Sequence, residues 1–463
     1  MKLNYFNFKG IKDKVLLTND LGKYVFIDKS DLKKLIAKDI DLESDIGKKL
    51  TSAGMVYGGS DIHFSEINEY RLRTVKSHMA TATSLHIFVV TTMCNMNCLY
   101  CQANNGKSTP NCFMSEEIAK NAVDIALQSP EKCLSFEFQG GEPLLNFPII
   151  KFITEYAESV NKYHIIEYNL VSNLTLLTDE MLDFFEKHSF SISTSIDGNI
   201  ELHNMNRPLK DGTGSFEKCI EGVHRIKERG LPIGAIQTTT RYSLDNAKQI
   251  VNTYVEEGFS SIFIRHLTQL GKAGNGWENI GYSADEFLEF YKEIIDTLIQ
   301  LNKDGVTVRE QHASIFLKRI NGKRMNYMEL RSPCGGGIGQ LAYFADGRVF
   351  TCDEGRMLAE MGIDSFQLGD VRNDSYESLM RNSSCKTVCA ASMLETIPTC
   401  CDCVYQPYCG TCPVVNFALN EDIIEKQPGS FRCEVYRGIL DYLFELILEN
   451  DEETMKVLNR WSE

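Results

Sequence analysis

Short apolar runs alternate with amphipathic segments over residues 85 to about 305. Six of these runs have the length and residue content of strands, and they occupy residues 85–91, 133–138, 164–171, 190–196, 232–238 and 261–267. The segments between them have helical spacing, and the alternation fades after a helix near 284–301. Alternating strands and helices are typical of a parallel sheet. The pattern predicts an α/β protein with a partial, TIM-like (βα)6 barrel rather than a closed barrel of eight units.

The first 80 residues have a pattern of their own. Two strand-like runs at 14–18 and 23–27 are joined by a turn, and a helix with Ser30 as its N-cap follows. Helical spacing then continues to residue 50 and gives way to an apolar run at 55–57. The order strand, strand, helix, helix, strand predicts a small unit in front of the barrel.

Composition and charge narrow the class of protein. The 463 residues are 43% hydrophobic and 24% charged, as in ordinary soluble proteins. The formal charge of −15 argues against nucleic-acid or anionic-membrane partners. The sequence contains neither an apolar run of about 18 residues nor the order of a signal peptide, so we expect a cytoplasmic protein.

Sixteen cysteines are then the main chemical signal, because thiols in a reducing compartment serve as metal ligands or buried groups more often than as disulfides. Cys94, Cys98 and Cys101 follow the first strand with CX3CX2C spacing. Three thiolates on one loop can hold three corners of a four-iron cluster and leave the fourth iron open. A zinc knuckle, or three unrelated thiols, is the alternative.

Polar residues follow the next strands at the ends where parallel folds bind ligands. The second strand leads into Gly140, Gly141 and Glu142, where glycines permit close backbone approach and the carboxylate can accept from an ammonium group. Other candidates at strand ends or just beyond are Ser172, Asn173, Ser195 and Arg207. A turn or helix cap is the alternative for each, and Ser215 is expected to be an N-cap.

These motifs resemble those of the radical S-adenosylmethionine (SAM) superfamily, in which an aromatic residue, here Tyr100, precedes the last cysteine of the loop and the second strand ends in a GGEP-type motif. The resemblance implies that Cys94, Cys98 and Cys101 hold a [4Fe–4S] cluster whose open iron is chelated by SAM. It implies the following SAM-binding residues: Tyr100, Gly140, Gly141, Glu142, Ser172, Asn173, Ser195 and Arg207.

The carboxyl-terminal cysteines resemble the SPASM extension of radical enzymes. Cys334 and Cys352 flank Gly347 in a CX12GX4C pattern, and a CX2CX5CX2C group of Cys400, Cys403, Cys409 and Cys412 precedes Cys433. The last interval of that group is one residue shorter than in the SPASM pattern. A zinc ribbon is the alternative, although it leaves the other three cysteines unexplained.

The SPASM resemblance implies two auxiliary [4Fe–4S] clusters, three clusters in all. Cys400, Cys403, Cys409 and Cys433 would hold the outer one, and Cys334, Cys352 and Cys412 the inner one. The usual fourth inner cysteine has no counterpart in residues 335–339, which leaves an iron open to substrate or to Cys385, Cys389 or Cys401. We expect Cys112, Cys133 and Cys219 to be buried small hydrophobes.

Asp353 directly follows Cys352, as a carboxylate does in sulfatase-maturing relatives, where it is taken as the base that removes a substrate proton. The resemblance therefore implies a catalytic role for Asp353. A solvated carboxylate beside Glu354 is the alternative.

Within the superfamily, the local strings at 137–146, 351–355 and 408–413 are similar to maturases of the His-Xaa-Ser peptide system. The amino-terminal unit resembles the winged-helix-like element that recognises leader peptides, with a simple packed cap as the alternative. The implied domains are 1–80 for recognition, 81–310 for the barrel, 311–440 for SPASM and 441–463 for a terminal helix.

This family implies a radical enzyme that installs a C–C or thioether crosslink in a ribosomally made precursor peptide bearing a leader. An external electron donor such as flavodoxin or ferredoxin would be the second partner. Two alternatives stay open: oxidation of a single residue, as in sulfatase maturases, and a zinc-stabilised binding protein without catalysis.

Overall fold

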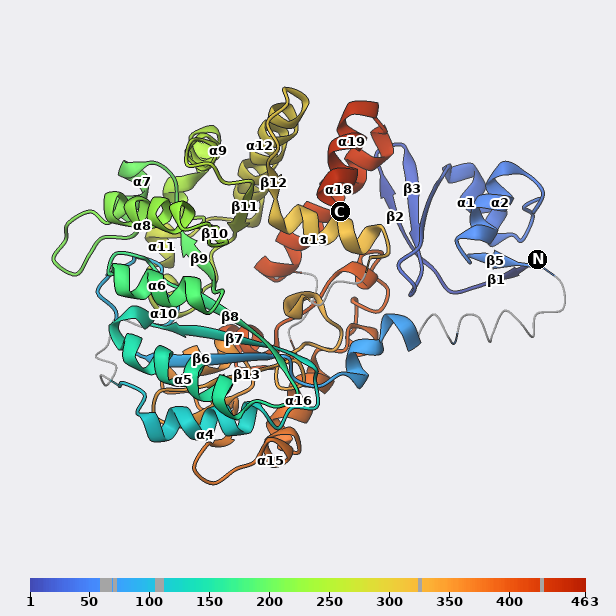
Figure 1. Ribbon diagram of the computed structural model, residues 1–463. Helices are drawn as coiled ribbons and strands as arrows, with labels where there is room; N and C mark the ends of the chain where they lie inside the picture. Colours follow the sequence, from blue (N-terminus) through green and yellow to red (C-terminus); the bar gives the residue numbers. More distant parts are fainter. Residues whose placement is uncertain (59–68, 70–72, 105–111, 324–326, 425–428) are drawn as a thin grey trace.

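The computed structural model describes the chain except for residues 59–68, 70–72, 105–111, 324–326 and 425–428. Its centre is one ten-stranded sheet in the order β12-β11-β10-β9-β8-β7-β6-β13-β14-β15 (Figure 1). The parallel strands from β6 to β12 are β6 Leu85–Thr91, β7 Cys133–Gly140, β8 Ile165–Val171, β9 Ser191–Ser195, β10 Ile233–Thr238, β11 Ser261–Arg265 and β12 Arg309–Glu310. The six predicted strands are confirmed, each to within two residues at either end, and β12 is an addition.

Helices follow the strands and cover the sheet. Several of them begin at a hydroxyl side chain that lies just before the apolar spacing. Ser115, Thr178 and Ser283 each accept a hydrogen bond from the first turn of their helix. The helices of this region are α4 Glu116–Ala126, η2 Pro143–Asn146, α5 Phe147–Val160, α6 Asp179–Lys187, α7 Ile200–Asn206, α8 Phe216–Glu228, η3 Arg241–Asn246, α9 Ala247–Glu256, α10 Gly271–Asn275, α11 Trp277–Ile280 and α12 Ala284–Lys303.

The carboxyl-terminal region extends the same sheet, which the sequence pattern did not predict. β13 Gln340–Tyr343 pairs parallel with β6, and β14 Arg348–Phe350 and β15 Gln367–Asp370 continue it antiparallel. β12 and β15 form its two edges within the described ranges, so the sheet is open. Its new strands are three or four residues long, and β13 pairs with β6 across more than 200 residues of sequence, which periodicity alone does not reveal.

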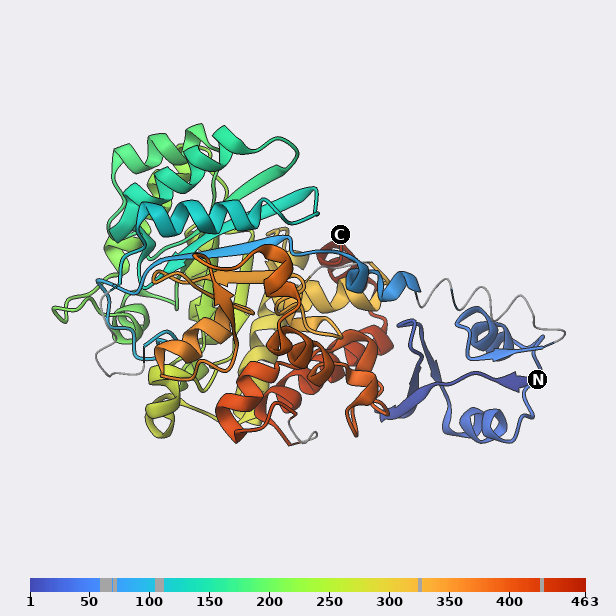
Figure 2. The same cartoon turned by 90° about the horizontal axis from the view of Figure 1, so that it is seen from below.

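The remaining helices gather beside this sheet (Figure 2). They are η1 Ser77–Ala80, α13 Gln311–Ile320, η4 Met328–Leu330, α14 Asp353–Glu360, α15 Tyr376–Met380, α16 Ser383–Ala391, η5 Leu394–Thr396, η6 Gln406–Tyr408, α17 Pro413–Asn420, α18 Phe431–Glu449 and α19 Glu452–Trp461. The prediction of one terminal helix at 441–463 was wrong. α18 begins before that range, and the left-handed backbone of Asn450 separates it from α19, which Asp451 caps.

None of the helices in the described ranges combines the length and the apolar character that a membrane span needs.

The amino-terminal unit holds two small antiparallel sheets and two helices. Its elements are β1 Lys2–Leu3, β2 Asn7–Ile11, β3 Lys14–Thr18, β4 Tyr24–Ile27, α1 Lys29–Ile36, α2 Asp45–Ser52 and β5 Val56–Tyr57. β1 pairs with β5, and β2, β3 and β4 form a meander. The prediction of Ser30 as N-cap was wrong, because the extended residue before α1 is Asp28 and Ser30 lies inside the first turn.

This unit packs on the rest of the molecule through β3 and β4. Val15 and Leu17 enter its own apolar cluster, whereas Leu16, on the opposite face of β3, enters the main core. The rings of Tyr24 and Phe26 contact Phe444 of α18, with centroid distances of 5.3 and 6.2 Å. The unit therefore has its own core and is also docked on α18 (Figure 1).

Candidate functional site

The CX3CX2C loop is held at the carboxyl end of β6 by the turn that follows β7. Gly141 N donates to Thr91 O at 2.9 Å, and Glu142 N donates to Met93 O at 2.7 Å. A Cβ on Gly140 or Gly141 would lie 2.4 Å from Thr91 O or 2.3 Å from Met93 O. The two glycines thus permit the turn to pack on the backbone that leads to Cys94.

Glu142 joins the ends of β7 and β8 in a buried network. Its Oε1 accepts from Ser172 Oγ at 2.7 Å and from Leu144 N at 3.1 Å, and its Oε2 accepts from Asn173 N at 2.8 Å. Burial raises the pKa of Glu142, and these donors and Arg207 oppose that rise. A carboxylate offers about four lone-pair sites, so one acceptor position is left for a ligand such as an ammonium group.

Tyr100 lies between Arg207 and a second carboxylate, Asp197. Tyr100 Oη lies 2.8 Å from Asp197 Oδ2, to which it donates, and accepts from Arg207 Nη1 at 2.7 Å. All three side chains are buried, and Arg207 Nε has no partner among the described residues. Sequence reasoning did not assign Asp197 a role, although a carboxylate directly after a strand end was the available signal.

Ser215 fixes the segment that carries Arg207. Its Oγ donates to Arg207 O at 2.5 Å and contacts His203 Nε2 at 3.1 Å. Ser215 occupies the predicted N-cap position of α8, but its side chain holds Arg207 and makes no capping hydrogen bond to the helix. Ser195 is half-buried at the end of β9, where its carbonyl accepts from Cys219 Sγ.

The three thiols of the loop lie close to one another and to this network. The pKa of Cys94 is raised to about 12, chiefly by burial and to a smaller extent by Glu142, Cys98 and Cys101. Burial also raises the pKa of Cys98, whereas Arg207 lowers it. Buried thiols of high pKa lose their protons when they bind a metal. Three neighbouring sulfur donors on one loop fit a [4Fe–4S] cluster with one open iron.

A second group of thiols, the inner group, consists of Cys334, Cys352 and Cys412. The three contribute to one apolar cluster with Val388 and Val414. Cys352 stands at the N-cap of α14, where its Sγ accepts from Gly355 N at 3.3 Å. Burial raises the pKa of Cys352, with the nearby Glu354, Cys412 and Cys334 as further causes.

The outer group lines a cavity of about 410 Å³ and consists of Cys400, Cys403, Cys409 and Cys433. Burial raises the pKa of Cys409 to about 12, and Cys403 and Cys433 add to the rise. Cys409 and Cys412 are thus separated into different groups although only two residues lie between them. In the described part of the chain, no three His, Cys, Asp or Glu side chains converge as they would around a single ion.

The other cysteines are scattered. Cys219 is buried and Cys112 half-buried, but Cys133 is exposed at the start of β7, so its prediction as a buried hydrophobe was wrong. Cys401 turns its carbonyl to Tyr5 Oη and Asn7 Nδ2 of the amino-terminal unit.

Asp353 is held by a buried arginine and is not a freely solvated carboxylate. Arg356, which is 2% exposed, pairs through Nε with Asp353 Oδ1 and through Nη1 with Glu360 Oε1, both at 2.7 Å. Its Nη2 donates to Gln139 Oε1 at 3.2 Å, one residue before Gly140. Arg356 therefore links Asp353 to the turn that supports the CX3CX2C loop.

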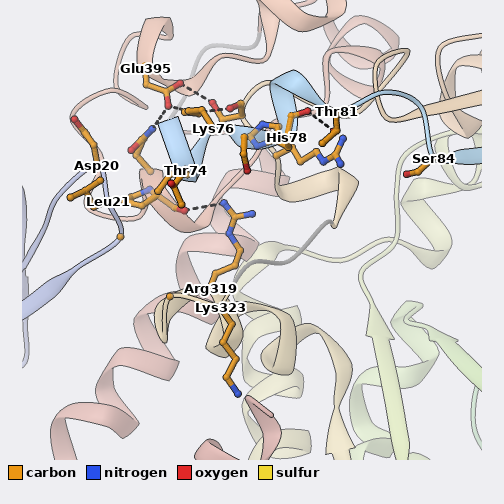
Figure 3. A pocket seen from close by; sticks show the side chains of 18 of the residues that line it. Asp20, Leu21, Thr74, Lys76, His78, Thr81, Ser84, Arg319, Lys323 and Glu395 are labelled. Atoms are coloured by element: carbon orange, nitrogen blue, oxygen red, sulfur yellow. Dashed lines mark hydrogen bonds and ion pairs between the residues drawn. The ribbon is translucent and has the colours of Figure 1, made fainter. Parts of the chain in front are cut away.

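A larger cavity, of about 490 Å³, lies at the other end of the sheet (Figure 3). Ser84 and Cys133, which precede or begin β6 and β7, line it, as do Lys76 and Glu395, which form an ion pair. Because the predicted site residues follow the carboxyl ends of the same strands, this cavity is separate from the cysteine loop.

Comparison with known proteins agrees with this geometry. The family model of the radical SAM superfamily matches residues 88–244, which contain the loop cysteines, Glu142, Asp197 and Arg207. An uncharacterized protein of Methanocaldococcus jannaschii is 32% identical over 176 residues, 38% of this chain but only 60% of that protein. A serine-type anaerobic sulfatase-maturating enzyme of Bacteroides thetaiotaomicron is 25% identical over 390 residues, 77% of this chain and 88% of that enzyme.

Two solved structures share the fold. Native anSMEcpe with bound AdoMet and Kp18Cys peptide has a TM-score of 0.67 at 21% identity, covering 82% of this chain and 99% of its own. Streptococcus suis SuiB bound to precursor peptide SuiA has a TM-score of 0.56 at 12% identity, covering 92% and 98%. With the match over residues 88–244 and the cysteine loop at the head of that range, the chain carries a radical SAM domain.

Proposed function

We propose that this enzyme removes hydrogen from a ribosomally made precursor peptide and installs an intramolecular C–C or thioether crosslink. The observation that carries the proposal is the presence of two further cysteine groups beside the radical SAM domain, one in an apolar cluster and one lining a cavity. A crosslink removes two hydrogens from the peptide, and the second leaves as a proton and an electron. An enzyme that makes such a bond needs a base and an electron acceptor in addition to the radical source.

The cofactors would have distinct places on the chain. Cys94, Cys98 and Cys101 would hold the cluster that binds SAM, and the inner and outer groups would hold the auxiliary clusters. When bound, SAM and its cluster supply removal of a hydrogen atom, and auxiliary clusters supply electron acceptance. Tyr100, the two glycines of the β7 turn and Ser195 are proposed to complete the SAM site.

The chain's own residues orient these partners. Glu142, fixed by Ser172 and Asn173, would accept from the SAM ammonium group, and Arg207 would direct its unpartnered Nε–H to the SAM carboxylate. Asp353 would accept the substrate proton. Its ion pair with Arg356 holds the carboxylate in a fixed direction, which a base requires before the reaction begins.

The amino-terminal unit is proposed to bind the leader of the precursor. β2 and β4 are the edges of its three-stranded sheet, so an extended leader can add a strand to one of them. Residues 1–50 hold eleven lysines against eight acids, which suits an acidic leader. The solved relative named as bound to a precursor peptide covers most of this chain, which supports a peptide substrate.

Oxidation of a single residue is the second candidate, because the sulfatase-maturating relative matches over 77% of this chain and Asp353 follows Cys352 as the sequence pattern of those enzymes requires. Both reactions can remove two hydrogens from a serine-containing peptide. The chemical difference is that oxidation of an alcohol leaves a carbonyl, whereas a crosslink leaves none.

The test uses anaerobically prepared enzyme with SAM, a reductant and a small peptide encoded beside it. We expect 5′-deoxyadenosine and a peptide lighter by two hydrogens, with fragmentation suppressed between the joined residues and no reaction with a hydrazide. A hydrazide-reactive product of the same mass would instead establish single-residue oxidation. Enzyme containing zinc and no iron, or a Cys94→Ala/Cys98→Ala/Cys101→Ala variant that still makes 5′-deoxyadenosine, would refute the radical site.

A further inference from the structure

The inner group presents three thiols. Residues 335–339, where the SPASM pattern has a fourth cysteine, contain none. Glu354 is the side chain best placed to complete it. It lies two residues after Cys352, in the first turn of α14, and α14 packs against α17, whose N-cap is Cys412. Cys334 joins the other two through their shared apolar cluster.

Glu354 is the charged group common to all three thiols. Burial raises the pKa of Cys352 and of Cys412, and after burial Glu354 is the strongest cause in each case. For Cys334 as well, burial comes first and Glu354 is the strongest of the nearby charges that raise the pKa. Glu354 therefore lies close enough to act on all three thiols, as its place in the first turn of α14, beside Cys352, requires.

The neighbouring carboxylates show what is unusual about Glu354. Asp353 and Glu360 both pair with Arg356. Among the described residues, no other residue donates a hydrogen bond or forms an ion pair with the Glu354 carboxylate, although it is half-buried. Carboxylates drawn away from water are normally paired, protonated or bound to a metal, and Glu354 has no ion-pair partner among the described residues.

We propose that Glu354 is the fourth ligand of the inner auxiliary cluster and binds the iron that Cys334, Cys352 and Cys412 leave open. Carboxylate oxygen is an established ligand of protein-bound iron. This inference rests on the proposed function, which places a cluster at the inner group. It assigns that cluster to electron transfer, because a closed cluster has no iron free for the substrate.

Cysteine is the competing donor. Cys389 on α16 acts on Cys334 but has no comparable effect on Cys352 or Cys412. Cys385 faces the glycine-rich turn, where a Cβ on Gly337 would lie 2.6 Å from its Sγ. Cys401 lies in the segment of the outer group, and its carbonyl accepts from Tyr5 of the amino-terminal unit. None of these thiols acts on all three inner cysteines as Glu354 does.

The test uses the full chain with Cys94→Ala/Cys98→Ala/Cys101→Ala, so that only auxiliary clusters remain, reconstituted without oxygen. Its iron content should be about eight per chain, four for each cluster. Carbon-13-labelled cyanide is then added to the reduced protein, and its hyperfine coupling is measured by electron paramagnetic resonance. E354A should bind cyanide with a labelled signal at least tenfold stronger than the parent. E377A, a control that removes an exposed glutamate paired with Arg381, should behave as the parent, and E354C should restore a closed cluster.

The outcomes separate the two proposals. If the parent contains only about four irons, or none, then the inner cluster or both auxiliary clusters are absent. The proposed function then fails together with this inference, before cyanide is used. With eight irons present, an E354A signal equal to that of the parent, or a strong signal only in C389A, overturns the role of Glu354 alone. If E354A loses about four irons, recovery in E354C supports ligation, and failure of E354C to recover them overturns it.

Discussion

The radical SAM domain and the carboxyl-terminal cysteine region hold their reactive groups in different ways. In the first, side chains at the ends of neighbouring strands bind one another, as Glu142 does with Ser172 and Tyr100 with Asp197. In the second, the thiols sit at helix caps and loop turns around an apolar cluster and a cavity. A parallel sheet brings successive strand ends to one edge, so regular topology builds the first site. The second site is built from irregular segments, and each of these must be held in place by its own packing contacts.

The largest effect is expected where the two strand ends pack backbone on backbone. G141A places a Cβ 2.3 Å from Met93 O, which must displace the start of the cysteine loop. We expect loss of about four irons per chain and of all SAM cleavage, measured by iron analysis and 5′-deoxyadenosine assay. G234A in β10, where a Cβ meets no atom within 4 Å, is the control. Equal iron in both variants would show that the turn does not support the loop.

Removing the carboxylate that accepts from Tyr100 should follow in size. D197N takes away a buried negative charge that acts on the buried Arg207 guanidinium, at a cost of about 3–5 kcal/mol in the free energy of unfolding. SAM cleavage should fall about a hundredfold in protein that remains folded, since about 2.7 kcal/mol corresponds to that factor. Urea unfolding and the initial rate of 5′-deoxyadenosine formation measure the two effects.

The control for this variant is D183N on the surface, where Asp183 pairs with Arg229. An exposed pair contributes about 0–1 kcal/mol, so D183N should leave both measurements nearly unchanged. If D197N also left the unfolding free energy and the rate of SAM cleavage unchanged, the Tyr100–Asp197–Arg207 network would have no part in the site.

Breaking the link between the two regions should uncouple hydrogen removal from product formation. R356M frees Asp353 from Arg356 and from its connection to Gln139. We expect 5′-deoxyadenosine to form at a near-normal rate while modified peptide per 5′-deoxyadenosine falls about tenfold, because the base is no longer directed. Chromatography of both products gives the ratio, and E360Q is the control that keeps the Asp353 pair. An unchanged ratio in R356M would remove Asp353 from the reaction.

A smaller effect is expected on the reduction potential of the cluster at the outer group. Arg432 lines the outer cavity, and its Nε has no partner among the described residues. R432M removes a positive charge and a donor beside the outer group, so the reduction potential of that cluster should fall by about 50 mV. Potentiometric titration followed by electron paramagnetic resonance measures the shift. R381M, which removes an arginine paired with Glu377 at the surface, should leave the potential unchanged.

Prediction from sequence succeeded in the region built by regular topology. The apolar runs gave the six parallel strands, and the strand ends gave the positions of Cys94, Glu142 and Ser172. It missed β13 to β15, because strands of three or four residues leave almost no periodic signal, and β13 pairs with the distant β6. It placed Ser215 correctly at the start of α8 but missed its bond to Arg207, since a hydroxyl at a helix start has the same local signature whether or not it caps the helix.

What the sequence determined by itself was the chemistry: three thiols on one loop, an acidic turn after the next strand, and seven later cysteines in a recognisable order. Tertiary structure decided which distant segments meet. It brought Arg356, which pairs locally with Asp353, to Gln139 on β7, and it extended the central sheet by pairing β13 with β6. Spacing along a chain reflects local geometry, whereas contacts between segments hundreds of residues apart are set by how the elements pack.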